Sequence, residues 1–172
     1  MSDQQYTIEE IRGVPYFDLE LYLSISRQTR VDGPAFDKMT ALWDELGKHL
    51  RIRRVLADQE YYALWMEEPV EEMVDKAWEE SAADGFMAAT LAQTMLMSVV
   101  QELVPGVAEQ GCAPIPAPTE GLKAALEELG IPWRDEGALP RQYAMLTTAE
   151  ISSGCASCHL EANCPTSKAK QS

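Results

Sequence analysis

The sequence predicts an all-α fold, a single-domain bundle of about five to six helices with a cysteine-rich loop near the C-terminus. Three stretches carry this prediction because their apolar residues recur at intervals of three and four: residues 36–50, 70–81 and 86–104. The chain has 172 residues and is 46% hydrophobic, which is enough apolar material for one core. We therefore expect one helical domain over 1–165, with a helical body at 1–106 and a disordered tail at 166–172.

The first element, residues 17–26, shows the pattern of a strand. Its apolar residues alternate with polar ones: Phe17, Leu19, Leu21, Leu23 and Ile25. A lone strand leaves its backbone groups unpaired, and the sequence offers no convincing second strand. We therefore predict a helix here, and a strand paired across a homodimer is the alternative.

The next stretch gives the clearest helix. After Gly33-Pro34 the apolar residues line one helix face: Phe36, Met39, Trp43, Leu46 and Leu50. A similar pattern resumes after a break near Gly47 and continues through 52–66 until Pro69. We expect a further helix over 52–66.

Two long helices follow. Residues 70–81 are apolar on one side and acidic on the other, which predicts an amphipathic helix with an exposed acidic face. Residues 86–104 are apolar nearly all round, which predicts a central helix that ends at Pro105-Gly106. We interpret the methionines of this helix as core residues rather than as metal ligands.

The last third of the chain is less regular. Three prolines between residues 114 and 118 exclude a helix just after Cys112. Thr119 is expected to cap a short helix that ends at Gly130. We expect irregular chain over 131–142 and a last helical turn or two over about 139–151.

The charge of the chain is strongly negative. Its 14 basic and 28 acidic side chains give a net charge of −14, so its field repels nucleic acid and anionic lipid. We expect a protein partner with a basic surface, and neither nucleic acid nor a membrane. One basic cluster either lies on a solvated helix face or binds an anion or a partner, and it comprises Lys48, His49, Arg51, Arg53 and Arg54.

The N-terminus has no basic stretch followed by an apolar run, and polar residues interrupt the apolar segment 86–104. The sequence therefore predicts neither a secretory signal nor a membrane span, and we expect a cytoplasmic protein. Thiols stay reduced in that compartment, so clustered cysteines there indicate metal or redox chemistry before structural disulfides.

The cysteines are the strongest functional signal. Three of the four form Cys155-x2-Cys158-x5-Cys164, followed by Pro165, and 42 residues separate Cys112 from this triplet. A C-x2-C turn presents two thiolates to one metal centre, five more residues bring the chain back for a third, and a distant loop cysteine completes the shell. We predict that the four thiolates bind a [4Fe-4S] cluster, which makes 107–165 a cluster-binding segment with a C-terminal metal-binding loop.

This set of one remote cysteine and a C-x2-C-x5-C-Pro triplet resembles several [4Fe-4S] ligand sets. Similar sets occur in WhiB-like and FNR-type sensors, in helical glycosylases related to endonuclease III, in AddB and Cas nucleases that carry an iron staple, and in the molybdenum-trafficking protein NifQ. The resemblance covers about a dozen residues plus Cys112, so it lies at the level of the motif and not of the whole chain. It implies cluster ligation by Cys112, Cys155, Cys158 and Cys164.

Two other cofactors are candidates. Zinc could take the same four thiolates, or three of them and His159, in a tetrahedral shell. The pentapeptide from Cys155 to His159 also matches the C-x-x-C-H sequence of c-type cytochromes, but haem would leave Cys112 and Cys164 without a role. Beside a cluster, His159 is either an exposed loop residue or a hydrogen-bond donor that tunes a sulfur.

We expect a small redox protein, an electron-transfer or accessory (assembly) partner of a larger metalloenzyme. The alternatives are an iron–sulfur sensor that responds to oxygen or nitric oxide, and a structural module held together by its metal. Outside the cysteines the sequence carries no enzyme signature: it has no phosphate-binding Gly-rich loop and no Gly-x-Ser-x-Gly, and its two histidines do not supply a Glu-x-x-His di-iron site.

Overall fold

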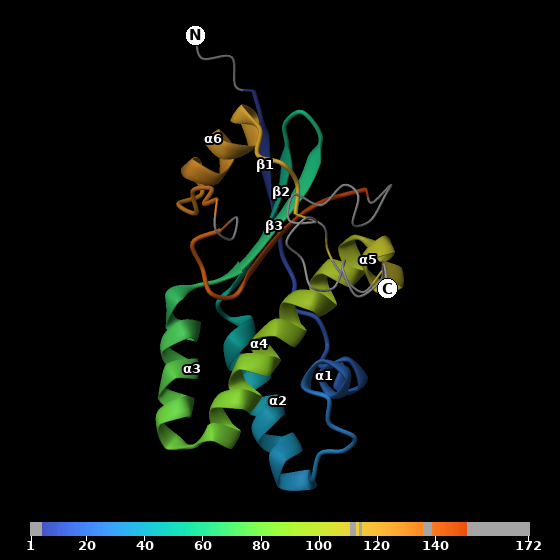
Figure 1. The fold of residues 1–172 in the computed structure, drawn as a ribbon, viewed down its shortest axis with the longest axis vertical. Coiled ribbons are helices and arrows are strands. Elements are labelled where there is room, and N and C mark those ends of the chain that lie inside the picture. Colours follow the sequence, from blue (N-terminus) through green and yellow to red (C-terminus); the bar gives the residue numbers. More distant parts are fainter. Residues whose placement is uncertain (1–4, 111–112, 114, 136–138, 151–172) are drawn as a thin grey trace.

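The computed structural model describes residues 5–110, 113, 115–135 and 139–150. Within these residues it contains six helices and a four-stranded antiparallel sheet (Figure 1). The protein is therefore mixed α and β, and the all-α prediction is wrong. In chain order the elements are β1 (Thr7–Ile11), α1 (Leu19–Ser26), α2 (Gly33–Gly47), β2 (Leu50–Leu56), β3 (Glu60–Met66), α3 (Glu68–Glu80), α4 (Ala82–Leu103), α5 (Pro105–Gln110), α6 (Glu120–Glu128) and β4 (Ala144–Thr148).

The strands lie in the order β1-β2-β3-β4, and every neighbouring pair is antiparallel. β2 and β3 form a hairpin at the centre, in which Ile52 lies opposite Leu64. The outer strands come from the two ends of the described chain: β1 pairs with β2, and β4 pairs with β3 so that Leu146 lies opposite Ala63. Each strand thus obtains the backbone partners that a lone strand lacks.

The helix predicted over 52–66 is instead the β2–β3 hairpin. Both strands bury side chains on both of their faces: Ile52 packs in one hydrophobic core and Val55 in the other. β3 is apolar over most of its length, and a short apolar run does not separate a helical period from a strand period, whereas three arginines interrupt the apolar residues of β2. The turn, in which the Ala57 amide donates to the Gln59 carbonyl over 3.0 Å, also lacks the Asn-Gly or Asp-Gly pair typical of hairpins.

The helical turns predicted over 139–151 are also wrong, because β4 occupies Ala144–Thr148. β1 was not predicted at all. Both strands have five residues, too few to show a period, and each needs a partner that is distant in the sequence. Their pairing depends on the β2–β3 hairpin, which the sequence did not reveal.

α1, α2, α3, α4 and α6 agree with the predictions, and local capping explains part of this agreement. α5 was not predicted, because Pro105-Gly106 was interpreted as the end of a helix. The helix preferred for 17–26 is α1, in which the Asp18 side chain accepts a hydrogen bond from the Leu21 amide over 2.9 Å. Thr119 caps α6 by accepting from the Leu122 amide over 3.3 Å. The chain leaves α6 through Gly130, whose φ of +77° favours glycine.

Two hydrophobic cores lie on opposite faces of the sheet. In Figure 1, α6 lies beside the upper part of the strands, apart from α1, α2 and α3 at the lower end. We call the larger one the helix-side core; it is formed by α1 to α5 and one face of the sheet, and includes Leu46, Leu64, Leu91, Met95 and Val100. We call the smaller one the α6-side core; it includes Val55, Tyr61, Trp65, Leu126 and Leu146. Where the sequence indicated apolar material for one core, the described residues form two, separated by the sheet.

α4 is the central helix, as predicted. Leu91, Met95 and Val100 are completely buried, so its methionines do act as core residues at least at position 95. By length and composition alone α4 could cross a membrane. However, 56% of the 18-residue apolar stretch that gives this result is buried inside the protein. Packing against α1, α2, α3 and β3 accounts for its apolar character.

Candidate functional site

The predicted cluster ligands lie outside the described residues. Cys112, Cys155, Cys158 and Cys164, together with His159, all fall in this category, so their predicted roles are still predictions. Within the described residues no group of three or more His, Cys, Asp or Glu side chains is placed to hold a metal ion. What the structure provides is the position of the chain that adjoins the cysteines and the character of the surface around it.

Two described stretches contact the β2–β3 turn: the chain that follows Cys112 and the chain that precedes Cys155. After Cys112 the chain packs on the helix-side core at Ala113 and on the α6-side core at Ile115, and Thr119 Oγ1 then donates to Asp58 over 2.8 Å. Before Cys155, the amide of Ala149 donates to the Glu60 carbonyl over 2.9 Å.

Chain length sets how far the cysteines can be from this turn. Cys112 is seven residues before Thr119 and Cys155 is six residues after Ala149. An extended chain spans at most about 3.3–3.6 Å per residue, so seven residues reach at most about 25 Å. The described chain that follows Cys112 and the described chain that precedes Cys155 are thus attached to the same turn, which is compatible with the predicted shared metal centre.

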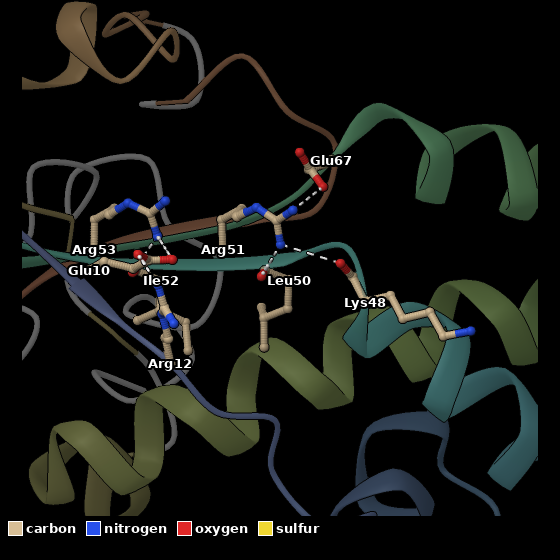
Figure 2. Close-up of polar contacts among 8 residues, drawn as sticks. All are labelled: Glu10, Arg12, Lys48, Leu50, Arg51, Ile52, Arg53 and Glu67. Atoms are coloured by element: carbon tan, nitrogen blue, oxygen red, sulfur yellow. Dashed lines mark hydrogen bonds and ion pairs between the residues drawn. The ribbon is translucent and has the colours of Figure 1, made fainter.

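The basic cluster lies on the sheet and not on a helix face. Arg51 and Arg53 belong to β2, and Figure 2 shows their side chains next to each other on one side of that strand. Arg51 lies opposite Trp65 and Arg53 opposite Ala63, and both of these partners belong to the α6-side core. The two arginines therefore lie on the same face of the sheet as the α6-side core, in the part of β2 that follows α2.

Arg51 and Arg53 are each held by a carboxylate and by backbone carbonyls (Figure 2). Arg51 Nη2 lies 2.8 Å from Glu67 Oε1, and its Nη1 donates to the Leu50 carbonyl over 2.9 Å. Arg53 lies 3.8 Å from Glu10 Oε1 and 5.7 Å above the centre of the Trp65 ring. Their charges are thus balanced within the protein.

Arg54 lies between two carboxylates on the neighbouring strands. Its Nε is 2.5 Å from Glu60 Oε1 and its Nη1 is 3.0 Å from Glu9 Oε2. The hydrogen bond with Glu60 is the main cause that raises the pKa of Arg54, and the hydrogen bond with Glu9 raises it further. The same hydrogen bond from Arg54 lowers the pKa of Glu60. Both partners of this pair are favoured in their charged forms.

Of the two interpretations of the basic cluster, a solvated helix face is wrong and an anion site is not favoured. Each of its three arginines already contacts at least one carboxylate, so little uncompensated positive charge is left for an external anion. His49 likewise lies beyond the end of α2, where its Nδ1 is 3.6 Å from Glu67 Oε1. No local pattern signals these pairs, because their carboxylates come from β1, from β3 and from Glu67, the cap of α3.

A surface cleft of about 760 Å³ was not predicted from the sequence. It lies between α1, the N-terminal half of α2 and the start of α4, and its lining includes Tyr22, Arg30, Met39 and Met87. No sequence motif marks it, because it is formed by side chains that only the tertiary fold brings together.

Comparison with known proteins does not place the chain in a family. No family model, curated protein or solved structure matches it.

Proposed function

We propose that the protein is a small cytoplasmic [4Fe-4S] protein that acts as an electron-transfer or accessory partner of a larger metalloenzyme. Cys112, Cys155, Cys158 and Cys164 hold the cluster. The observation that carries this proposal is the spacing of the cysteines in the sequence, with a C-x2-C-x5-C-Pro triplet and one remote cysteine. Haem at Cys155 and Cys158 would leave Cys112 and Cys164 without a role, whereas a cluster uses all four thiols and leaves no ligand position open for a substrate.

The chemistry of the donor set supports a thiophilic centre. Four thiolates are soft ligands, which suit iron–sulfur clusters and zinc and do not suit calcium or magnesium. Zinc sites of four cysteines more often contain two C-x2-C pairs, whereas this chain has one. When bound, a cluster would supply one-electron transfer, and the chain would supply the four thiolates that hold it. His159 is either an exposed loop residue or a hydrogen-bond donor to a sulfur.

The surface charge supports a basic protein partner. On α3 the exposed face carries Glu72, Asp75, Glu79 and Glu80. The arginines of β2 add little positive potential because carboxylates of the same chain contact them. A surface of this sign attracts a basic docking site and repels nucleic acid, and we expect the association to weaken as salt is added.

The first experiment identifies the metal in the full chain purified without oxygen. We expect a brown protein with a broad absorbance shoulder in the violet and four iron and four sulfide per chain for a complete cubane. Sharp Soret and α bands would assign haem instead, and a colourless protein containing zinc would assign a zinc site. Either result, or a metal-free protein, would refute the iron–sulfur proposal.

The second experiment tests the remote ligand. We expect Cys112→Ser to lose most of the bound iron, because hydroxyl is a far weaker ligand for the cluster than thiolate. Ser157→Ala is the matched control, since it changes a small side chain inside the triplet without removing a thiol. Full iron content in Cys112→Ser would show that Cys112 is not a ligand.

Electrochemistry separates the functional classes once the cluster is established. Electron transfer requires reversible reduction while the circular dichroism of the protein stays unchanged. A structural staple would be redox-silent and would unfold on chelation, and a sensor would lose its cluster in air with a change in partner binding. Only the first result supports the proposed role.

A further inference from the structure

The cleft between α1, α2 and α4 has the size and lining of a small-molecule site. Its volume of about 760 Å³ lies within the range of about 300–1,000 Å³ typical of ligand pockets. The connection from α1 to α2 forms one wall, the first turns of α2 form the second and the first turn of α4 forms the third. Three separate elements therefore enclose it.

The floor of the cleft is apolar. Tyr22 and Met39 are 1% and 3% exposed, and Val31 and Met87 are partly buried against the same helix-side core. Phe86 lines the cleft too and is 42% exposed, so it adds apolar surface at the edge of the cleft. An apolar ligand body placed here would extend a core that already exists.

One polar group at the floor has no partner. The Tyr22 hydroxyl makes no hydrogen bond to any residue that the structure describes, although Tyr22 is 1% exposed. Among the described residues, Ser98 Oγ is the only side-chain oxygen or nitrogen that is both fully enclosed and without a partner. The Tyr22 hydroxyl is therefore not fully enclosed, and Tyr22 is one of the residues that line the cleft.

The charged residues of the rim are not equivalent. Asp32 accepts from the Ala35 amide over 2.8 Å as the cap of α2, and Asp84 pairs with Lys38 over 3.3 Å. Arg30 forms no ion pair or hydrogen bond with the part of the chain that the structure describes. Asp37, which is exposed, has no such partner for its carboxylate either.

We propose that this cleft binds a small monocarboxylate with an apolar body, such as a medium-chain aliphatic acid. The body packs on Met39, Met87 and Phe86, the Tyr22 hydroxyl donates a hydrogen bond to a ligand oxygen, and Arg30 supplies the uncompensated positive charge. This site is independent of the cysteines, so it stands or fails separately from the proposed cluster.

The side chains that line the cleft favour a carboxylate over an alcohol or an amine with the same apolar body. A neutral alcohol gains the apolar contacts and the hydrogen bond but no attraction to Arg30. A cationic amine is attracted to Asp32 and Asp37 at the exposed rim, where ion pairs are weak, as is the attraction of a carboxylate to the exposed Arg30. A carboxylate obtains both the hydrogen bond to Tyr22 and the attraction to Arg30, and hydrogen bonds to charged acceptors are stronger than neutral ones.

The test measures binding of three probes of equal chain length to the full protein: octanoate, octanol and octylamine. We expect octanoate to shift the amide resonances of residues 22–39 and 83–87 in NMR spectra and to bind more tightly than the other two. Tighter binding of octylamine or octanol would overturn the charge assignment. Shifts elsewhere in the chain, or no binding of any probe, would overturn the site.

Four variants assign the contacts. Tyr22→Phe removes only the hydroxyl and is expected to weaken octanoate about ten-fold. Arg30→Gln is expected to weaken it about two- to five-fold, while Asp37→Asn strengthens it by a similar factor because a like charge is removed. Lys76→Gln is the control, since it removes a positive charge from α3, outside the cleft.

Each substitution removes one polar group and changes the side-chain size little, so the relative affinities of the variants test the contacts one by one. Equal affinity of Arg30→Gln and Lys76→Gln would show that only the net charge of the protein matters. Unchanged binding by Tyr22→Phe, with octanol affected as little as octanoate, would show that the hydroxyl does not contact the ligand. Either result would overturn the proposed contacts.

Discussion

The two faces of the sheet are covered in different ways. Among the described residues, twenty buried ones form the helix-side core, to which five helices contribute, whereas ten form the α6-side core under one nine-residue helix and the chain that follows it. α4 contributes seven buried residues to its core, whereas α6 contributes three, Leu122, Ala125 and Leu126. Local opening starts where few apolar contacts hold an element, so we expect α6 to open before α4.

Polar contacts add to the attachment of α6. The Tyr61 hydroxyl donates to Asp58 over 2.9 Å, and Thr119, the cap of α6, donates to the same carboxylate over 2.8 Å. At the other end of the helix the Tyr6 hydroxyl donates to Glu128. In α4, by contrast, Thr94 bonds to its own helix through the Thr90 carbonyl, which adds no tertiary contact. The smaller core is thus supplemented by polar contacts that connect distant parts of the chain.

The largest effect should come from truncating the two cores in parallel. Leu91 of α4 and Leu126 of α6 are both completely buried. We expect Leu91→Ala to lower the free energy of unfolding by about 3–4 kcal/mol and Leu126→Ala by about 2 kcal/mol, because the thinner layer around α6 can relax into the cavity. Urea denaturation measures both, and Leu56→Ala, at a position that is 40% exposed, is the control.

Hydrogen exchange shows whether the difference is local. Leu126→Ala should lower the protection of α6 amides while α4 amides keep theirs, whereas Leu91→Ala should lower protection throughout. Uniform loss of protection in Leu126→Ala would mean that the two cores unfold as one unit, and the comparison would then fail.

An intermediate effect is expected at Asp58. Partial burial works to raise the pKa of Asp58, but the hydrogen bonds from Thr119 and Tyr61 outweigh it, so its pKa in the folded protein is below the ordinary 3.8. The charged form therefore stabilises the fold fully above pH 3.8, and this stabilisation is lost as the pH falls through the lower folded value. We expect Asp58→Asn to cost about 0.5–1 kcal/mol at neutral pH, a small value because the residue is exposed.

Thermal unfolding of Asp58→Asn at two pH values provides the check. The difference from the parent protein should shrink when the pH falls below the folded pKa of Asp58, since the parent carboxyl is then neutral too. Asp44→Asn is the control, because no hydrogen bond or ion pair to the described chain involves the Asp44 side chain. A difference that stays constant with pH would assign the effect to shape and not to charge.

The helices could be predicted because their signals are local. The caps Asp18 and Thr119 lie within three residues of the amides they accept from. The sheet could not, because the register that places Leu146 opposite Ala63 joins segments far apart in the sequence. The apolar run of β3 looked like part of a helix since it is buried on both sides.

The candidate sites divide in the same way. The cysteine spacing is a local pattern and gave a specific hypothesis about a metal centre, whereas the cleft at Tyr22 and Arg30 depends on how three helices meet. The basic cluster around Arg53 was visible, but its neutralisation was not, because Glu10 comes from β1. Charges of one sign in a sequence window say nothing about the partners that the sheet places opposite them.

The smallest effect is expected where the α6 side of the sheet carries charges in place of a core. Glu67 Oε1 is 2.8 Å from Arg51 Nη2, and the two side chains are 39% and 35% exposed. Exposed ion pairs contribute about 0.2–1 kcal/mol, so we expect Glu67→Gln to cost no more than about 0.5 kcal/mol at low salt and nothing at 1 M salt, where the Debye length is about 3 Å. Any lost carboxylate also relieves repulsion in a chain of charge −14, so Glu72→Gln, on the exposed face of α3, is the matched control. The difference between the two variants in thermal unfolding isolates the pair. A loss of unfolding free energy above about 1 kcal/mol that does not depend on salt would mean that the ion pair of Arg51 stabilises the sheet as strongly as apolar packing does. The contrast between the two faces would then no longer hold.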